Sequence, residues 1–339
     1  MPAASLALPR SATCLAPGLL LTLALALPAG WLGGRLPLVG APVFGILLGM
    51  AVKNFVLTGP ACDAGAAFAA SRLLKASVVA LGFGLDLGQV ARVGGASLGV
   101  TLATLATAFA SAWLLGRWLR VGRTLRLLIG AGTAICGGSA IAAVASVIGP
   151  DEHDTTLAIS VIFLFNVAAV LLFPPLGHLL GMSDAGFGLW AGTAINDTSS
   201  VVAAGYSFSQ AAGDQATIVK LTRATFIIPL CLGLALTGSL HRRRDDAQPA
   251  ALGRIFPWFI LGFLAASALG SAGLVPAAWQ APLQHLAGFL IVLALTAIGL
   301  GANLRKLAAS GPRPLLLGGA AWVAVATSSL AMQWLLSQL

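Results

Sequence analysis

The stretch Gln215-Ala-Thr-Ile-Val-Lys220-Leu-Thr-Arg223-Ala-Thr-Phe-Ile-Ile-Pro-Leu-Cys-Leu-Gly233 places two basic side chains within an apolar run. A similar pattern occurs earlier, at Arg72-Leu-Leu-Lys75-Ala-Ser-Val-Val-Ala-Leu81. An ionisable residue inside a membrane costs free energy, and such residues usually face a water-filled path or a substrate. The two pairs therefore predict a membrane protein with a positively charged binding region, and they suggest an internal repeat.

The composition supports a membrane protein. Of the 339 residues, 58% are hydrophobic and only 9% are charged, which is too little charge for the surface of a soluble protein of this length. Apolar runs of about 17–25 residues, the length that crosses a bilayer as a helix, recur along the whole chain. The 41 glycines are typical of membrane helices that pack closely together.

The net charge of +9 raises the question of nucleic-acid binding, but the basic residues are distributed in another way. They cluster in short segments between the apolar runs, which is the arrangement that orients membrane helices. The four cysteines lie far apart and predict neither a disulfide framework nor a metal site. Motifs for a nucleotide-binding loop or a histidine-bound metal are missing from the sequence. We therefore expect no nucleic-acid partner, no metal and no other cofactor.

The apolar runs predict an all-α polytopic membrane protein with about eleven transmembrane helices. The runs cover residues 14–31, 39–57, 67–86, 96–118, 127–149, 156–180, 186–208, 214–239, 255–275, 283–304 and 315–337. Residues 1–339 then form a single transmembrane domain without a soluble module. The first run follows Arg10 and resembles a signal peptide, but we expect it to be retained as a membrane helix.

The charged loops predict the orientation of the chain. Basic loops fall at residues 117–126, 241–244 and 305–313, and an acidic loop falls at residues 151–154. With eleven spans, the three basic loops lie on one side of the membrane and the acidic loop lies on the other. Because basic loops remain in the cytoplasm, we expect a bacterial inner-membrane protein with its N-terminus inside and its C-terminus outside.

Two pairs of matching segments predict an inverted repeat. The segment Thr133-Ala-Ile-Cys-Gly-Gly138 in the fifth span resembles Thr296-Ala-Ile-Gly-Leu-Gly301 in the tenth, and the basic pair of the third span resembles that of the eighth. The members of each pair lie five spans apart and run in opposite directions. We expect a leading helix at 14–31 and two five-helix repeats, at about 39–181 and 185–339, as in many secondary transporters. A rival match between residues 81–87 and 298–304 leaves another pairing open, although it would leave the fifth span without a partner.

Adjacent glycines near the centre of the fifth span predict an interrupted helix. They belong to the segment Cys136-Gly137-Gly138-Ser139, and each glycine weakens a helix by roughly 1 kcal/mol relative to alanine. A half-helix that begins in the membrane presents free N–H groups, which suit an anion. Gly299, Gly301 and Asn303 predict a matching interruption in the tenth span, so two interrupted helices are expected to cross. The alternative is close helix packing through small residues.

Three adjacent residues of the seventh span are further candidates for the site. Asp197 lies about eleven residues from the nearer end of this span, which places its carboxyl group near the middle of the bilayer. A lone carboxyl group in an apolar environment favours its protonated form, so Asp197 is a candidate for proton or ion coupling. The alternative is a structural ion pair with Arg223 or Lys75. Its neighbours Asn196 and Thr198 are candidates for a polar lining.

Arg223 and Lys75 are the candidate positive charges of the substrate site. Arg223 is too deep in the eighth span for its guanidinium to reach the membrane surface. Lys75 has a second interpretation, because a third span that begins near Ser71 would make it a cytoplasmic flanking residue. Together with Cys136, Gly137, Gly138 and Ser139, the two cations form the predicted substrate-binding region.

Three segments resemble a known family. They are Ala131-Gly-Thr-Ala-Ile-Cys-Gly-Gly-Ser-Ala140, Ile218-Val-Lys-Leu-Thr-Arg223 and Ala297-Ile-Gly-Leu-Gly-Ala-Asn-Leu-Arg-Lys306, and the chain is similar through them to the YeiH-like sulfate exporter family. That family is related to bile-acid-symporter-like and cation/proton-antiporter-like carriers. The resemblance implies inverted five-helix repeats with two crossed, interrupted helices. The pair Asn196-Asp197 is similar to a pair in some sodium/proton antiporters but lies elsewhere in the chain, so no antiporter ion site is inferred.

These observations favour a secondary transporter that exports a small anion, such as sulfate or an organosulfonate, by alternating access. An ion-coupled carrier of another organic acid remains an alternative, because the same site would serve it. An intramembrane enzyme or a membrane scaffold is less favoured, and we expect the protein not to be an enzyme. The expected partners are the anionic substrate and the lipid bilayer, and a homodimer is left open.

Overall fold

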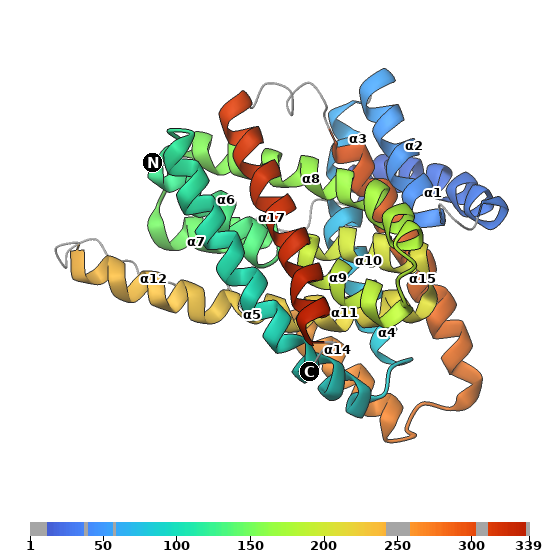
Figure 1. The fold of residues 1–339 in the computed structure, drawn as a ribbon. Coiled ribbons are helices and arrows are strands. Elements are labelled where there is room, and N and C mark those ends of the chain that lie inside the picture. Colours follow the sequence, from blue (N-terminus) through green and yellow to red (C-terminus); the bar gives the residue numbers. More distant parts are fainter. Residues whose placement is uncertain (1–11, 37–39, 57–58, 242–257, 303–310, 337–339) are drawn as a thin grey trace.

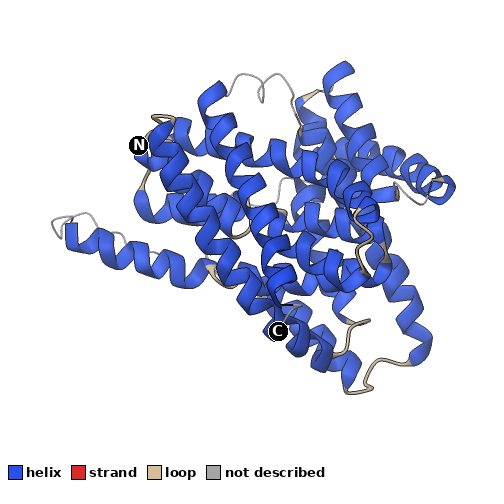
Figure 2. Ribbon diagram, in the orientation of Figure 1, coloured by secondary structure: helices blue, strands red, loops and turns tan. Residues whose placement is uncertain are grey.

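A computed structural model describes residues 12–36, 40–56, 59–241, 258–302 and 311–336 of the chain. The residues in these ranges form helices, turns and loops without a strand (Figure 2). The predicted all-α membrane fold is therefore confirmed, and each of the eleven apolar runs is largely helical.

Sixteen helical elements follow one another in the described part of the chain (Figure 1). They are α1 (Ala12–Arg35), α2 (Ala41–Phe55), α3 (Pro60–Phe68), the π-helical turn η1 (Ala69–Leu73), α4 (Leu74–Gly82), α5 (Leu87–Trp118), α6 (Arg123–Ala134), α7 (Gly138–Ile148), α8 (Glu152–Leu179), α9 (Asp184–Ala194), α10 (Thr198–Phe208), α11 (Gln210–Ala224), α12 (Ile227–His241), α14 (Trp258–Ser271), α15 (Ala277–Gly301) and α17 (Pro312–Leu336). Seven continuous helical stretches are long and apolar enough to cross a membrane: α1, α3 to α4, α5, α8, α11 to α12, α15 and α17. The shorter helices α2 and α14 are also apolar.

The seventh apolar run is a hairpin and does not cross the membrane. Helices α9 and α10 are separated by Ile195–Asp197, and the chain reverses there. The two far ends meet, because the Ser209 hydroxyl donates a hydrogen bond to the Asp184 carboxylate at 2.6 Å. The rings of Phe187 and Phe208 stack nearby with centroids 4.0 Å apart. The chain therefore enters and leaves this hairpin on the same side.

The fifth apolar run also forms a hairpin, from α6 and α7. In chain order, α6–α7 is here called the first hairpin and α9–α10 the second hairpin. A β-carbon built on Gly132 would lie 2.9 Å from the Ile141 side chain, although nine residues of continuous helix would separate the two positions by roughly 13 Å. The reversal uses Gly137, whose φ of 64° lies in the region that favours glycine. Figure 1 shows the two hairpins toward opposite ends of α8.

The first hairpin corrects the predicted sides of the loops. The side chain of Leu317, near the start of α17, lies against Gly116 near the end of α5, and Gly318 packs against Val161 in the first half of α8. The start of α8 therefore lies on the same side as the basic segment between α5 and α6. The prediction that the acidic loop 151–154 lies opposite that basic segment is wrong, because α6 and α7 do not cross the membrane.

The predicted interruption of the tenth span is also wrong. Helix α15 is continuous from Ala277 to Gly301. Gly299 instead allows close packing, since a β-carbon there would overlap the backbone carbonyl oxygen of Ile46 in α2. This is the small-residue packing that the sequence left open as an alternative. Gly301 ends the helix, and Asn303 lies outside the described residues.

The buried apolar residues form a large cluster around the hairpins and a smaller one between the hairpins and α2, α4 and α15. The large cluster includes Ile129 and Ile141 of the first hairpin, Trp190 of the second, Ile162 of α8 and Ile218 of α11. The smaller one, here called the central apolar cluster, contains Val43, Ile46, Ala80, Leu81, Val170, Val202, Ala203, Ala287, Ile291 and Leu295. The hairpins thus pack against α2, α4 and α15, and these three helices together with η1 are here called the frame.

The hairpin architecture predicts which loops share a side of the membrane. In a variant whose native cysteines are replaced, single cysteines at Gly122 and Glu152 should react with an impermeant maleimide from the same side. A cysteine at the exposed Ala185, at the base of the second hairpin, should react from the opposite side. Labelling of Gly122→Cys and Glu152→Cys from opposite sides would contradict the α6–α7 hairpin.

Candidate functional site

Lys220 joins the tips of the two hairpins. Its ammonium group donates hydrogen bonds to the carbonyl oxygens of Ile135 at 2.5 Å, Ile195 at 3.0 Å and Asn196 at 2.5 Å. Ile135 and Ile195 end the first helix of each hairpin, where carbonyl groups lack partners within the helix. One side chain of α11 therefore pairs with both helix ends.

Arg223 makes the same kind of connection one turn further along α11. Its Nε donates to the Ala134 carbonyl at 2.5 Å, its Nη2 donates to the Thr133 carbonyl at 2.7 Å, and its Nη1 donates to the Thr193 carbonyl. Both cations are 0% exposed. A positive charge at a helix C-terminus is favourable, because the helix dipole is negative there. The two cations therefore stabilise the C-terminal ends of α6 and α9.

The two hairpin tips have related sequences, which we did not detect from the sequence. Ala131-Gly-Thr-Ala-Ile135 is repeated without change as Ala191-Gly-Thr-Ala-Ile195, sixty positions later. The helix breaks follow the same spacing, because Gly137 precedes α7 and Asp197 precedes α10. The matching partner of the fifth span is therefore the seventh span, and the weaker Thr-Ala-Ile match in the tenth span was misleading.

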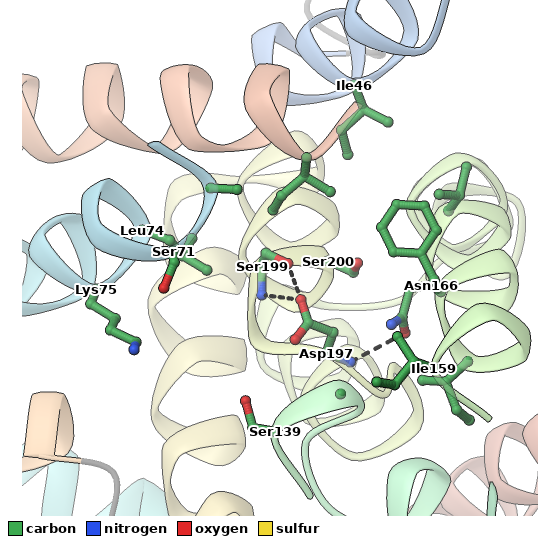
Figure 3. A pocket seen from close by; sticks show the side chains of 16 residues that line it. Ile46, Ser71, Leu74, Lys75, Ser139, Ile159, Asn166, Asp197, Ser199 and Ser200 are labelled. Carbon is green, nitrogen blue, oxygen red and sulfur yellow. Dashed lines mark hydrogen bonds between the residues drawn. The ribbon is translucent and has the colours of Figure 1, made fainter. Parts of the chain in front are cut away.

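The second helices of both hairpins begin at a cavity of about 310 Å³, here called the hairpin cavity (Figure 3). Gly138 and Ser139 of α7 line it together with Asp197, Ser199 and Ser200 of α10. The frame contributes the polar residues Ser71 and Lys75, and α8 contributes Asn166. The remaining wall is apolar and comes from Ile46, Ala70, Leu74, Ile159, Ile162, Phe163, Val167 and Ile298. Two helix N-termini thus meet one cavity.

The N-terminus of α7 is open toward the hairpin cavity. Its N-cap residue is Gly137, which has no side chain to accept a hydrogen bond from the first turn. A β-carbon on Gly137 would lie 3.3 Å from that of Asp197, so the two tips are in contact. The first N–H groups of a helix lack partners within the helix and favour an anionic ligand.

The N-terminus of α10 is capped by Asp197. One carboxylate oxygen, Oδ2, accepts hydrogen bonds from the Ser199 backbone N–H at 3.0 Å and from the Ser199 hydroxyl. The backbone N–H of Asp197 donates to the Asn166 side-chain oxygen at 3.2 Å, which ties the tip to α8. Asp197 therefore has a structural role as a helix cap while it also lines the cavity.

The structure brings together only part of the predicted site. Lys75, Gly138, Ser139 and Asp197 line the hairpin cavity, whereas Arg223 is bonded to backbone carbonyls and does not. The arrangement makes Arg223 a positioning residue. The other predicted residues that lie outside the described cavity lining are Cys136, Gly137, Asn196, Thr198, Gly299 and Gly301.

Asn196 and the residues overlooked in the sequence add polar groups around the tips. Asn196 is buried, and neither its amide nitrogen nor its amide oxygen has a hydrogen-bond partner among the described residues. Ser199 and Ser200, which the sequence offered as further polar lining residues beside Asn196 and Thr198, do line the cavity, whereas Asn166 and Ser71 line it but were not predicted as site residues. Asn166 was recognisable as a strongly polar residue inside an apolar run, although its depth relative to Asp197 required the hairpin geometry.

A second cavity of about 510 Å³ lies one to two turns away along the same helices. Pro42 of α2, Tyr206 of α10 and Val292 of α15 line it, whereas the hairpin cavity is lined by Ile46, Ser200 and Ile298 of these three helices. Residues of the central apolar cluster, such as Val202 and Leu295, lie between these positions along the helices. Two cavities thus lie along the interface between the hairpins and the frame, and apolar side chains of the central apolar cluster lie between the two cavities.

The carbonyl contacts predict that Lys220 and Arg223 support the fold. Replacing either residue with methionine leaves three buried carbonyl groups without a donor, and each unpaired buried group costs about 1–3 kcal/mol. We expect both variants to melt well below the wild-type protein in detergent. Arg92→Met, which removes an exposed cation of α5, is the control and should change stability by less than about 0.5 kcal/mol. Equal melting temperatures for Lys220→Met and Arg92→Met would contradict the capping role.

Comparison with known proteins identifies the family. The family model described as conserved hypothetical protein 698 matches residues 17–318. A UPF0324 membrane protein of Streptococcus pyogenes serotype M3 is 47% identical over 330 residues, which cover 94% of this chain and 96% of the relative. UPF0324 membrane proteins of Streptococcus mutans and Streptococcus agalactiae are 44% and 43% identical, again over 94% of this chain and over 96% and 97% of their own lengths.

No solved structure matches the chain. The names of the relatives specify a membrane protein but no substrate, so the sulfate exporter assignment stays a prediction. Since the family model covers most of the chain and the relatives are similar along nearly their whole length, this protein belongs to the conserved hypothetical protein 698 family of UPF0324 membrane proteins.

Proposed function

We propose that this protein is a secondary transporter of a small anion, such as sulfate or an organosulfonate, and that the hairpin cavity is its substrate site. The observation that supports this most directly is that the uncapped N-terminus of α7 and the ammonium group of Lys75 line one cavity. The N–H groups at a helix N-terminus bind anions well, and the partial positive charge of the dipole adds to the attraction.

The residues that line the cavity divide into two kinds. The first turn of α7, with Ser139, offers hydrogen-bond donors that no side-chain cap occupies. Lys75 has no hydrogen-bond or ion-pair partner among the described residues, so its ammonium group is available to a ligand. Asp197 is the only carboxylate among the described lining residues, and coupling of a proton at this site would therefore use Asp197.

The two cavities support transport by alternating access. They lie one to two turns apart along α2, α10 and α15, and residues of the central apolar cluster such as Val202 and Leu295 lie between them along these helices. A ligand in the hairpin cavity would reach the other side of the membrane only after this apolar contact has rearranged. An ion-coupled carrier of another organic acid would use the same cavities and remains the second candidate.

An enzymatic function is not part of this proposal. The described lining of the hairpin cavity contains no histidine or cysteine beside its serines, and the hydrogen bond from the Ser199 hydroxyl to Asp197 belongs to the cap of α10. We also propose that the basic segment 117–126 faces the cytoplasm, following the charge rule for membrane loops. The C-terminal end of α17 then faces outward, and the membrane is the bacterial inner membrane.

The proposal predicts a specific requirement for Lys75. A hydrogen bond to a charged group contributes about 1.5–3 kcal/mol, which corresponds to roughly a tenfold to hundredfold change in affinity. Lys75→Gln should therefore weaken anion binding, measured by thermal shift, and slow anion flux in proteoliposomes to the same degree. Arg72→Gln is the matched control, because Arg72 is an exposed cation one turn earlier that does not line the cavity. The absence of anion-dependent flux in the wild type, or equal effects of the two variants, would contradict the proposal.

A further inference from the structure

We propose that the substrate is a zwitterion, a small molecule with an anionic group at one end and an ammonium group at the other, such as an aminosulfonate. This inference rests on the proposed function, because it specifies what the hairpin cavity binds. It follows from the charges that line the cavity and from the groups there that remain without a partner.

The hairpin cavity contains two charged side chains of opposite sign. Lys75 extends from α4 on one side, and Asp197 lies at the tip of the second hairpin on another side (Figure 3). No ion pair joins them in the described structure. A lining with one positive and one negative group is complementary to a ligand that also has one of each. A sulfate ion would pair with Lys75 and the start of α7 but would meet the like charge of Asp197.

The second carboxylate oxygen of Asp197 is free to meet a positive group. The capping hydrogen bonds from Ser199 both end on Oδ2, and no described residue donates to Oδ1. Figure 3 shows Oδ1 on the side of the carboxylate away from Ser199. Either a proton or a positive group of the ligand would neutralise this oxygen. An ammonium group on the substrate does so without a separate coupling ion.

A buried serine provides independent support for a ligand beside Asp197. Ser200 lines the cavity with only 6% of its surface exposed, and its hydroxyl has no hydrogen-bond partner in the described part of the chain. The side-chain nitrogen of Asn166 likewise has no partner among those residues, although Asn166 is only 5% exposed. Neither atom is among the fully enclosed polar atoms of the described residues that lack a partner, so both reach the cavity, where a ligand or water can pair with them.

The apolar wall of the cavity favours a zwitterion with a carbon chain over a purely inorganic anion. Ile159, Ile162, Phe163 and Val167 of α8 form one face of the cavity. An inorganic oxyanion would gain nothing from this face, whereas the short carbon chain between an anionic group and an ammonium group would be shielded from water against it. The cavity volume of about 310 Å³ suits a small solute of this kind.

A matched series of sulfonates tests the inference on the full-length protein in detergent. The probes are 2-aminoethanesulfonate, 2-hydroxyethanesulfonate and ethanesulfonate, which share an anionic group and differ at the other end, together with inorganic sulfate. We expect 2-aminoethanesulfonate to bind at least tenfold more tightly than the other three probes. In Asp197→Asn this preference should disappear, while Glu152→Gln, which removes an exposed carboxylate of α8, should keep it. Asparagine is also a good N-cap residue, so the variant retains the helix cap.

The outcomes distinguish this inference from the proposed function. Equal binding of the three sulfonates by the wild type, or tighter binding of sulfate, would contradict a zwitterionic substrate and leave an anion transporter in place. A preference for the amine that survives in Asp197→Asn would contradict the role of Asp197. If no probe binds or moves across proteoliposomes, the proposed function itself fails. The wild-type preference decides the first question even if a variant does not fold.

Discussion

The structure depends on the pairing of two buried cations with the carbonyl ends of two broken helices. Lys220 and Arg223 lie one turn apart on α11, and each bonds to both hairpins. Six carbonyl groups that would otherwise be unpaired inside the membrane receive donors from these two side chains. Without them, the interruptions would cost several kcal/mol, because lipid cannot supply hydrogen bonds. The cations therefore allow the chain to turn back at mid-membrane.

Arg223 and Lys75 were expected to bind the substrate together, but the structure gives them different roles. The C-terminal ends of α6 and α9 are occupied by protein cations, which leaves the N-terminal ends of α7 and α10 to face the hairpin cavity. A ligand there meets the uncapped, partially positive N-terminus of α7, the ammonium of Lys75 and the carboxylate of Asp197 that caps α10. Arg223 thus shapes the site without touching the cavity, and Lys75 is the cation that a ligand would meet.

Much of the fold could be predicted from the sequence, because apolar runs report burial in lipid directly. All eleven runs are helical, and the break at Gly137 lies where adjacent glycines predicted it. Whether a run crosses the membrane or turns back could not be predicted from its length, because two helices of eleven or twelve residues and a short break are as long as one span. The repeated Ala-Gly-Thr-Ala-Ile was the available signal for the second break. In the tenth span, Gly299 looked similar because close helix packing and helix interruption both select glycine.

The cation bridges also constrain how a transporter of this design would move. Separating the two tips would require breaking the contacts of Lys220 with Ile135 and Ile195 and would expose charges and carbonyls to the bilayer interior. The contact between Val202 of α10 and its neighbours in the central apolar cluster is made by apolar side chains. Apolar contacts are not directional, so these surfaces can slide without losing specific bonds. A change in which side of the membrane reaches the cavity would therefore occur more easily at this contact than at the hairpin tips. The hairpins would then move as one unit, with the ligand held between two helix N-termini throughout.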